Sequence, residues 1–175
     1  IAASIGNESI ASIAMGNIYD DVSGSVKINV DTGPIISVSL GSNSESVIDI
    51  ANVNDRVTGN VDIDAVMLDV TNFSLGYQAK AITTVATVDA PVFGNVDIDV
   101  VTGVIFTGAV GSGITAETIV GSVKERVHGN VNIDVTSGAI SSFAIGIGVS
   151  ADEITGRTAI GSVLEETYGD VNIDV

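Results

Sequence analysis

The chain repeats itself every 35 residues, and this period constrains the fold more than any other feature of the sequence. The motif GNVDIDV at residues 94–100 recurs as GNVDIDA at 59–65, GNVNIDV at 129–135 and GDVNIDV at 169–175, with a looser copy, GSVKINV, at 24–30. The glycines that open these five copies are 35, 35, 35 and 40 residues apart. Such self-similarity is typical of repeat architectures, in which each unit stacks on the next.

Two further columns of small residues keep the same register. They are Gly6, Gly41, Gly76, Gly111 and Gly146, and then Gly16, Ala51, Ala86, Gly121 and Gly161. The five additional residues of the last unit therefore lie between Gly146 and Gly169, and we place them in SADEITGR (150–157). We read the chain as a single repeat array over 1–175, with units at approximately 1–30, 31–65, 66–100, 101–135 and 136–175.

Each unit is expected to contain about three short strands. Apolar and polar residues alternate in GNVDIDV, which is the period of a strand with one buried face, and the flanking segments are rich in Val, Ile, Thr and Ser. One strand is placed from the small-residue column onward (IANVND, IVGSVKE) and one in the repeated motif. The third follows a TG or SG corner (GPIISVSLG, GVIFTGAVG, GAISSFAIG).

A repeat made only of strands cannot bury its apolar face alone, whereas stacked units bury it against their neighbours. The sequence therefore predicts an all-β fold, a parallel β-solenoid with cross-β-like stacking and five coils of about 35 residues. With strands ~4.8 Å apart, five coils would be roughly 24 Å tall. Five antiparallel blades or hairpins are the alternative, which in-register columns at equal spacing disfavour.

Composition narrows the range of partners. The chain has 22 acidic and six basic residues and a net charge of −16, so binding to nucleic acid or anionic lipid through phosphates is not expected. Apolar residues make up 45% of the chain and aromatic residues only 4%, so the core must be built from Val, Ile and Ala. There is no cysteine, and neither a run of about 18 apolar residues nor a basic-then-apolar leader is visible, so membrane insertion is not expected.

The outward positions of the repeated strand carry acidic and amide side chains in columns. Carboxylates one strand spacing apart repel by about 1 kcal/mol in bulk water, so a stacked column needs either raised pKa values or cations between the coils. Calcium is the candidate ion, and no cofactor is otherwise required. The alternative is that these carboxylates are solvated and keep the strand soluble. The candidate ligands are Asp62, Asp64, Asp97, Asp99, Asp134 and Asp174.

The first unit departs from the acidic pattern, because Lys27 and Asn29 stand in the two columns that are mostly Asp elsewhere. Neither end of the chain has the polar cap that closes a free-standing solenoid. If copies stack head to tail, Lys27 lies between Asp62 of its own chain and Asn172 of the next, which would relieve repulsion at the junction. Such a contact does not close and generates a filament. The alternative is a longer protein trimmed to its ordered part.

Catalytic chemistry has little support in the sequence. The only histidine, His128, shares a column with Ser, Thr, Phe and Tyr, so we interpret it as a surface substitution. Paired carboxylates recur in every unit, which indicates a ladder rather than a glycosidase pair. We therefore expect no enzymatic activity. Ice binding is a minor alternative, and its best threonine column is Thr83, Thr118 and Thr158, interrupted by Ile13 and Ile48.

The repeated GNVxIDV strand, the TG or SG corner and the uncapped ends together resemble the repetitive subunits of bacterial extracellular fibres. These are the functional amyloids of biofilm matrices and related β-solenoid surface proteins, and the resemblance is one of type that spans the whole chain. It implies a structural protein outside the cell or on its surface, which polymerises with itself and supports a matrix or adhesion. A segment of a large secreted adhesin that binds sugars or surfaces, and an enzyme built on a solenoid, are the other classes.

Overall fold

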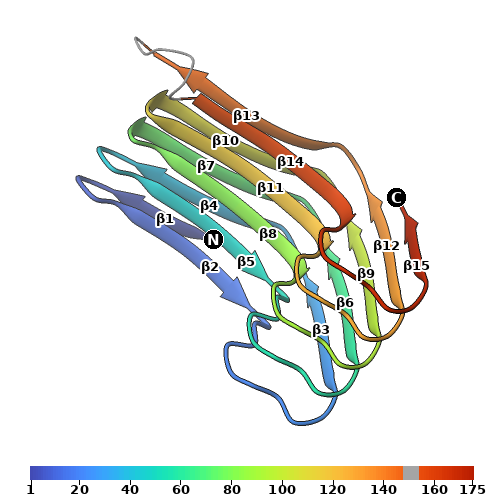
Figure 1. The fold of residues 1–175 in the computed structure, drawn as a ribbon. Coiled ribbons are helices and arrows are strands. Elements are labelled where there is room, and N and C mark those ends of the chain that lie inside the picture. The colour runs from blue at the N-terminus through green and yellow to red at the C-terminus, as the bar shows by residue number, and fades with distance from the viewer. Residues whose placement is uncertain (148–153) are drawn as a thin grey trace.

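The structure, a computed structural model, describes residues 1–147 and 154–175, and every regular element in these ranges is a β-strand. The strands form three five-stranded parallel sheets that wind as a solenoid (Figure 1). The prediction of an all-β parallel β-solenoid with about 35 residues per coil is confirmed. No antiparallel pair occurs among the described strands, which removes the alternative of blades or hairpins.

Each coil contributes one strand to each sheet. The β1 sheet contains β1 (Ala2–Ile5), β4 (Ile35–Leu40), β7 (Val70–Tyr77), β10 (Ile105–Ser112) and β13 (Ile140–Gly146). The β2 sheet contains β2 (Ile10–Met15), β5 (Glu45–Ile50), β8 (Lys80–Val88), β11 (Ile114–Val123) and β14 (Ile154–Val163). The β3 sheet contains β3 (Val26–Thr32), β6 (Val61–Met67), β9 (Val96–Thr102), β12 (Val131–Ser137) and β15 (Val171–Asp174).

The register of the last coil shows where its additional residues enter. Gly146 still pairs with Gly111, 35 residues earlier, whereas Ile154 pairs with Ile114, 40 residues earlier. The insertion therefore lies between Gly146 and Ile154. The predicted segment SADEITGR falls partly outside the described residues, and its last four residues belong to β14.

The strand expected after the small-residue column was misplaced. The β2-sheet strands lie before that column or run through it, and β5 ends at Ile50, immediately before Ala51. Beyond the column, the first two coils make only isolated parallel bridges such as Ile18 to Val53. In the later coils the strand pairing continues past it, as in Val88 with Val123 and Val123 with Val163.

Two features disfavour large side chains in the small-residue column. At all five of its residues φ lies between +50° and +70°, which is unfavourable for most residues. The column also faces the core, where a Cβ on Gly121 would lie 2.7 Å from Cγ2 of Val135.

The main apolar core lies inside the β3 sheet, as the alternation of the repeated strand predicts. Val96, Ile98 and Val100 are fully buried, and the equivalent residues of the neighbouring coils stack above and below them. Because Val and Ile are branched at Cβ, identical side chains can interlock along the axis and leave little free space. This continuous ladder of aliphatic side chains joins the coils into one core.

Between the β1 and β2 sheets many buried side chains are instead short and polar, and they lie beside a small apolar cluster of Ala79, Ala81, Ala109, Ile114 and Ala116. Ser37 Oγ lies 2.8 Å from Ser46 Oγ, and Thr107 Oγ1 lies 2.8 Å from both Thr83 Oγ1 and Thr118 Oγ1. These residues are fully buried, and their hydrogen bonds satisfy groups that would otherwise be costly to desolvate. We call this set the hydroxyl spine. Its members are Ser9, Ser37, Ser39, Ser44, Ser46, Ser74, Thr83, Thr107, Thr118 and Ser142.

The glycine column at the junction of the β1 and β2 sheets is required by stacking. Gly76 has φ +145°, and a Cβ there would lie 1.7 Å from the carbonyl oxygen of Gly41. Any larger residue would therefore break both the backbone conformation and the contact between coils. The same close approach recurs from Gly41 to Gly6 and from Gly111 to Gly76, which explains the 35-residue spacing of these glycines.

Candidate functional surfaces

The outer face of the β3 sheet carries the predicted acidic ladder. In its first column, Lys27 Nζ lies 2.5 Å from Asp62 Oδ2, and Asp97 Oδ1 accepts from Asn132 Nδ2 at 2.9 Å. Asn132 Oδ1 in turn accepts from Asn172 Nδ2 at 2.8 Å. Only Asp62 and Asp97 are adjacent carboxylates in this column, because Lys and Asn occupy the other coils.

In the second column no lysine or amide separates the carboxylates of the last four coils. Asp64, Asp99, Asp134 and Asp174 follow one another in register. Partial burial raises the pKa of Asp99 above the ordinary value of an aspartate, and the charges of Asp134, Asp64 and Asp97 raise it further. The first coil places Asn29 beside Asp64 and so ends the run of carboxylates.

The six predicted ligands therefore share one outer face, but they form a ladder rather than a cage. Within residues 1–147 and 154–175, no group of three or more His, Cys, Asp or Glu side chains is arranged to hold a metal ion. Two carboxylates on neighbouring strands supply oxygen ligands from one side only, and water would have to complete the coordination of a calcium ion. Calcium binding at this face stays a prediction.

The asparagine column at the start of the repeated strand could stack by hydrogen bonds from one amide side chain to the next, but it is ordered through the backbone instead. Asn60 Oδ1 accepts from the backbone N–H of Asn95 at 2.9 Å, and Asn95 Oδ1 accepts from the backbone N–H of Asn130 at 2.9 Å. The amide side chains therefore bind the backbone of the next coil, not the next amide side chain. Asp170 closes the column by donating its backbone N–H to Asn130 Oδ1 at 3.0 Å.

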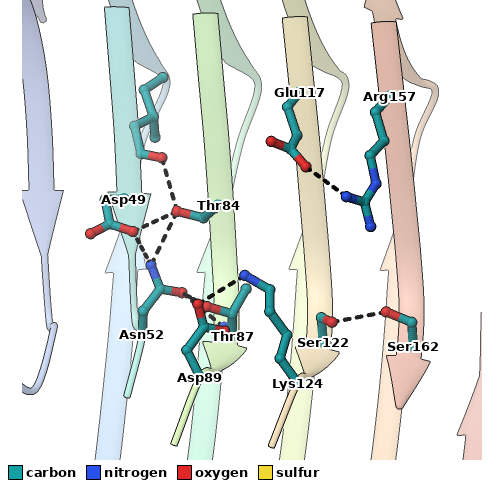
Figure 2. A network of polar contacts seen from close by, with 11 residues as sticks. Asp49, Asn52, Thr84, Thr87, Asp89, Glu117, Ser122, Lys124, Arg157 and Ser162 are labelled. Carbon is teal, nitrogen blue, oxygen red and sulfur yellow. Dashed lines mark hydrogen bonds and ion pairs between the residues drawn. The ribbon is translucent and has the colours of Figure 1, made fainter. Parts of the chain in front are cut away.

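The outer face of the β2 sheet is polar and paired. Lys80 Nζ lies 2.8 Å from Glu45 Oε1, and Arg157 Nη1 lies 3.3 Å from Glu117 Oε1. Each pair joins neighbouring strands, as Figure 2 shows for Glu117 and Arg157. These contacts are partly exposed, so each contributes modestly to stability.

A denser polar network surrounds Asp49, and sequence reasoning missed it. Asp49 Oδ1 accepts hydrogen bonds from Thr84 Oγ1 at 2.5 Å and from Asn52 Nδ2, and Asp49 Oδ2 accepts from Asn17 Nδ2 and Tyr19 Oη, each at 3.0 Å. Figure 2 shows Asn52 between Asp49 and the next coil. The carboxylate is thus held by donors from three coils, so we assign it to stacking rather than to ligand binding. Its signal in the sequence was weak, because no other coil has Asp in this position.

Three aromatic rings stack along one exposed corner of the solenoid. Phe93 and His128 lie parallel with centroids 4.8 Å apart, and His128 and Tyr168 follow at 5.0 Å. His128 is exposed as expected, and its ring also lies between those of Phe93 and Tyr168. The 35- and 40-residue spacing of the three residues was the available signal.

The threonine column considered for ice binding is buried except at the last coil, where Thr158 is exposed. Thr83 and Thr118 are fully buried in the hydroxyl spine, and Ile48 of the same column is buried as well. Thr83 and Thr118 therefore cannot form the exposed threonine surface that ice binding would need.

The last coil exposes the interior of the stack, whereas Val26, Ile28 and Val30 of the first coil are buried. Val171 and Ile173 are 46% and 40% exposed, whereas Val131 and Ile133, their equivalents one coil earlier, are at most 1% exposed. Strands β13, β14 and β15 each pair with one neighbour only, as do β1, β2 and β3 at the other end. An open, shallow depression at this first-coil end is lined by Ala14, Met15, Gly16, Asn17 and Tyr19.

Comparison with protein-family models, with curated protein sequences and with solved structures gave no match. Among the residues that the structure describes, no helix is long and apolar enough to cross a membrane.

Proposed function

We propose that the chain is a structural subunit of an extracellular filament, which grows by head-to-tail stacking of solenoids and supports a biofilm matrix or surface adhesion. The proposal includes no catalytic step and no cofactor. A functional amyloid in this sense is a fibre in which every coil continues the hydrogen-bonded ladders of the coil before it.

The exposed interior of the last coil is the observation that supports the proposal most. A ladder of Val and Ile that is buried through four coils is open to water at Val171 and Ile173. Strand edges with unpaired backbone groups are templates for further pairing. A further coil would cover both the side chains and the edges, and in this proposal a second copy supplies it.

The side chains on the outer face of the β3 sheet are compatible with such a contact between two copies. Continuation of the β3 sheet would place Lys27 next to Asn172 of the preceding copy, and Asn29 next to its Asp174. Lys27 already pairs with Asp62 of its own chain, and an amide beside Asp174 offers a donor where an acid would repel. The first coil is the one coil in which both columns lack an acid, so the junction avoids opposed carboxylates.

The test is a concentration series by electron microscopy and sedimentation velocity near neutral pH. We expect unbranched filaments with an axial rise of about 24 Å, which is five strand spacings. Ile173→Lys should stop growth, because it places a charge in the stacking face. The matched control is Val101→Lys, since Val101 is 41% exposed and Ile173 40%, but Val101 lies on the side of the solenoid.

A second variant blocks the opposite end by steric means. Gly6 has open space around its Cα in the single chain, whereas its equivalent Gly41 would clash with the carbonyl oxygen of Gly6. In a stacked pair, Gly6→Ala would meet Gly146 of the preceding copy in the same way. Gly33→Ala is the control, because Gly33 also has open space but lies outside the column. Filaments that form equally well from Ile173→Lys and Gly6→Ala would refute head-to-tail stacking.

A segment of a large secreted adhesin is the second candidate, and the exposed ladder of Phe93, His128 and Tyr168 favours it. Exposed aromatic rings are common at recognition surfaces. In this case further coils of the same protein would cover the ends, and the present chain would remain monomeric at every concentration. Binding to a glycan panel that Phe93→Ala abolishes would then support the adhesin function.

A further inference from the structure

Among the described strands of the β1 sheet, no charged side chain lies on the outer face. Strand alternation places Ile36, Val38 and Leu40 of β4 outward, because Ile35, Ser37 and Ser39 are buried. The other four strands follow the same alternation. We call this surface the apolar face. Its residues are Ala3, Ile5, Ile36, Val38, Leu40, Thr71, Phe73, Leu75, Phe106, Gly108, Val110, Ser141, Phe143 and Ile145.

The polarity of this sheet is therefore inverted. Its inner side carries much of the hydroxyl spine, while its water-facing side carries Leu75 at 40%, Phe106 at 36% and Ile145 at 52% exposure. The outer faces of the other two sheets have the ordinary arrangement, with the acidic ladder on the β3 sheet and ion pairs on the β2 sheet. A contiguous apolar surface on an otherwise acidic chain marks a contact site.

Aromatic side chains form the centre of the apolar face. The ring centroids of Phe106 and Phe143 are 4.8 Å apart, and those of Phe73 and Phe143 are 6.3 Å apart. A Cβ on Gly108 would lie 2.3 Å from Cζ of Phe143, so the missing side chain of Gly108 makes room for the ring. Three rings from consecutive coils thus gather around one glycine, which gives the face an aromatic centre of the kind found in protein interfaces.

We propose that the apolar face packs against the same face of a second copy, so that two solenoids associate side by side. The face measures roughly 20 Å along the strands and 24 Å across them, so a pair would bury about 1,000 Å², the lower range for a specific interface. Sheets pack face to face in this way in β-sandwiches. Lateral pairing does not depend on head-to-tail stacking, although a filament would multiply the paired area.

Charge permits contact between two copies at the apolar face. Each chain has a net charge of −16, so most approaches between copies are repulsive. The apolar face has no carboxylate, and the acidic ladder lies on a different sheet, so contact there opposes no like charges. Added salt should strengthen this association, because it screens the net repulsion while apolar burial persists.

The test uses three lysine variants whose wild-type residues are almost equally exposed. Leu75 on the apolar face, Val101 on the acidic face and Ile173 at the stacking end are 40%, 41% and 40% exposed. Sedimentation velocity on Ile173→Lys, in which head-to-tail growth is blocked, should show a monomer–dimer equilibrium. Adding Leu75→Lys should weaken that dimer about tenfold or more, whereas adding Val101→Lys should leave it unchanged.

Circular dichroism and thermal melting of each variant establish that it is folded before association is compared. The proposal is overturned if Ile173→Lys stays monomeric at every concentration and salt level, or if Leu75→Lys and Val101→Lys dimerise equally. Co-sedimentation of the monomer with uncharged phosphatidylcholine vesicles would assign the apolar face to a lipid surface and overturn it as well. Filaments that stay single in the unmodified chain would overturn lateral pairing and leave head-to-tail stacking intact.

Discussion

Asp99 and Asp134 are direct partners in the β9–β12 register, so their carboxylates stand one strand spacing apart on the outer face of the β3 sheet. Partial burial and the charges of Asp134, Asp64 and Asp97 raise the pKa of Asp99. Stacking thus opposes ionisation at this position, and the pH dependence of stability should report it.

The chain should become less stable as pH rises through the raised pKa of Asp99. Folded Asp99 holds its proton to a higher pH than unfolded Asp99, so unfolding releases a proton in this window, and stability falls with rising pH. Asp99→Asn should raise the free energy of unfolding at pH 7 by a few tenths of a kcal/mol to about 1 kcal/mol, and have little effect near pH 3. Urea denaturation across pH measures this, with Asp20→Asn as the control outside the ladder. An equal gain in both variants would contradict the prediction.

Calcium should stabilise the folded chain if ions lie between the carboxylates of the ladder. At a calcium concentration ten times the Kd, binding to the folded state alone adds about 1.4 kcal/mol, or a rise in Tm of roughly 3–6 °C. Differential scanning calorimetry with calcium and with magnesium at equal ionic strength tests this. The shift should disappear in the double variant Asp99→Asn, Asp134→Asn. Equal Tm values with both ions would instead support the solvated role of these carboxylates.

Thr107 is the central residue of the hydroxyl spine, and its removal should be costly. Thr107→Val keeps the shape of the side chain but deprives the buried Thr83 and Thr118 hydroxyls of a partner. We expect a loss of about 1–3 kcal/mol in the free energy of unfolding by guanidinium titration. Thr71→Val on the outer side of the same sheet is the control and should change stability by less than about 0.5 kcal/mol. Similar stability of both variants would mean that the spine stabilises through packing alone.

The sequence was sufficient to predict the period, the parallel stacking and the inward side of the β3 sheet. In-register columns such as Val61, Val96 and Val131 leave one arrangement in which identical residues stack. The acidic ladder followed from the same columns, because side chains alternate strictly along a strand.

The polarity of the other two sheets could not be predicted in this way. Alternation in a segment such as Ile35–Leu40 defines two faces, but it does not say which one is buried. The polar side is buried here because a second sheet supplies matching hydroxyls, such as Ser46 opposite Ser37. That pairing joins residues of different strands in one coil, and a 35-residue period contains no information about it. The same uncertainty concealed the apolar face.

The glycine column offers a graded test of how much stacking depends on close backbone contact. Gly76→Ala combines an unfavourable positive φ with a contact of 1.7 Å to the carbonyl oxygen of Gly41, whereas Gly6→Ala at φ +143° has only the unfavourable conformation. Gly33→Ala has neither. In the Ile173→Lys background, we expect the free energy of unfolding to fall by more than about 4 kcal/mol in Gly76→Ala, by about 1–3 kcal/mol in Gly6→Ala and by less than about 0.5 kcal/mol in Gly33→Ala.

Chemical denaturation of the three variants measures this series, and the difference between Gly76→Ala and Gly6→Ala isolates the contact between coils. Because that contact repeats along the column, we expect Gly76→Ala to lose its fold and Gly6→Ala to remain folded with the intermediate loss of stability. Equal losses in the two variants would show that conformation alone, and not the approach of successive coils, selects glycine in this column. The 35-residue spacing of these glycines would then reflect a repeated turn rather than the stacking of one coil on the next.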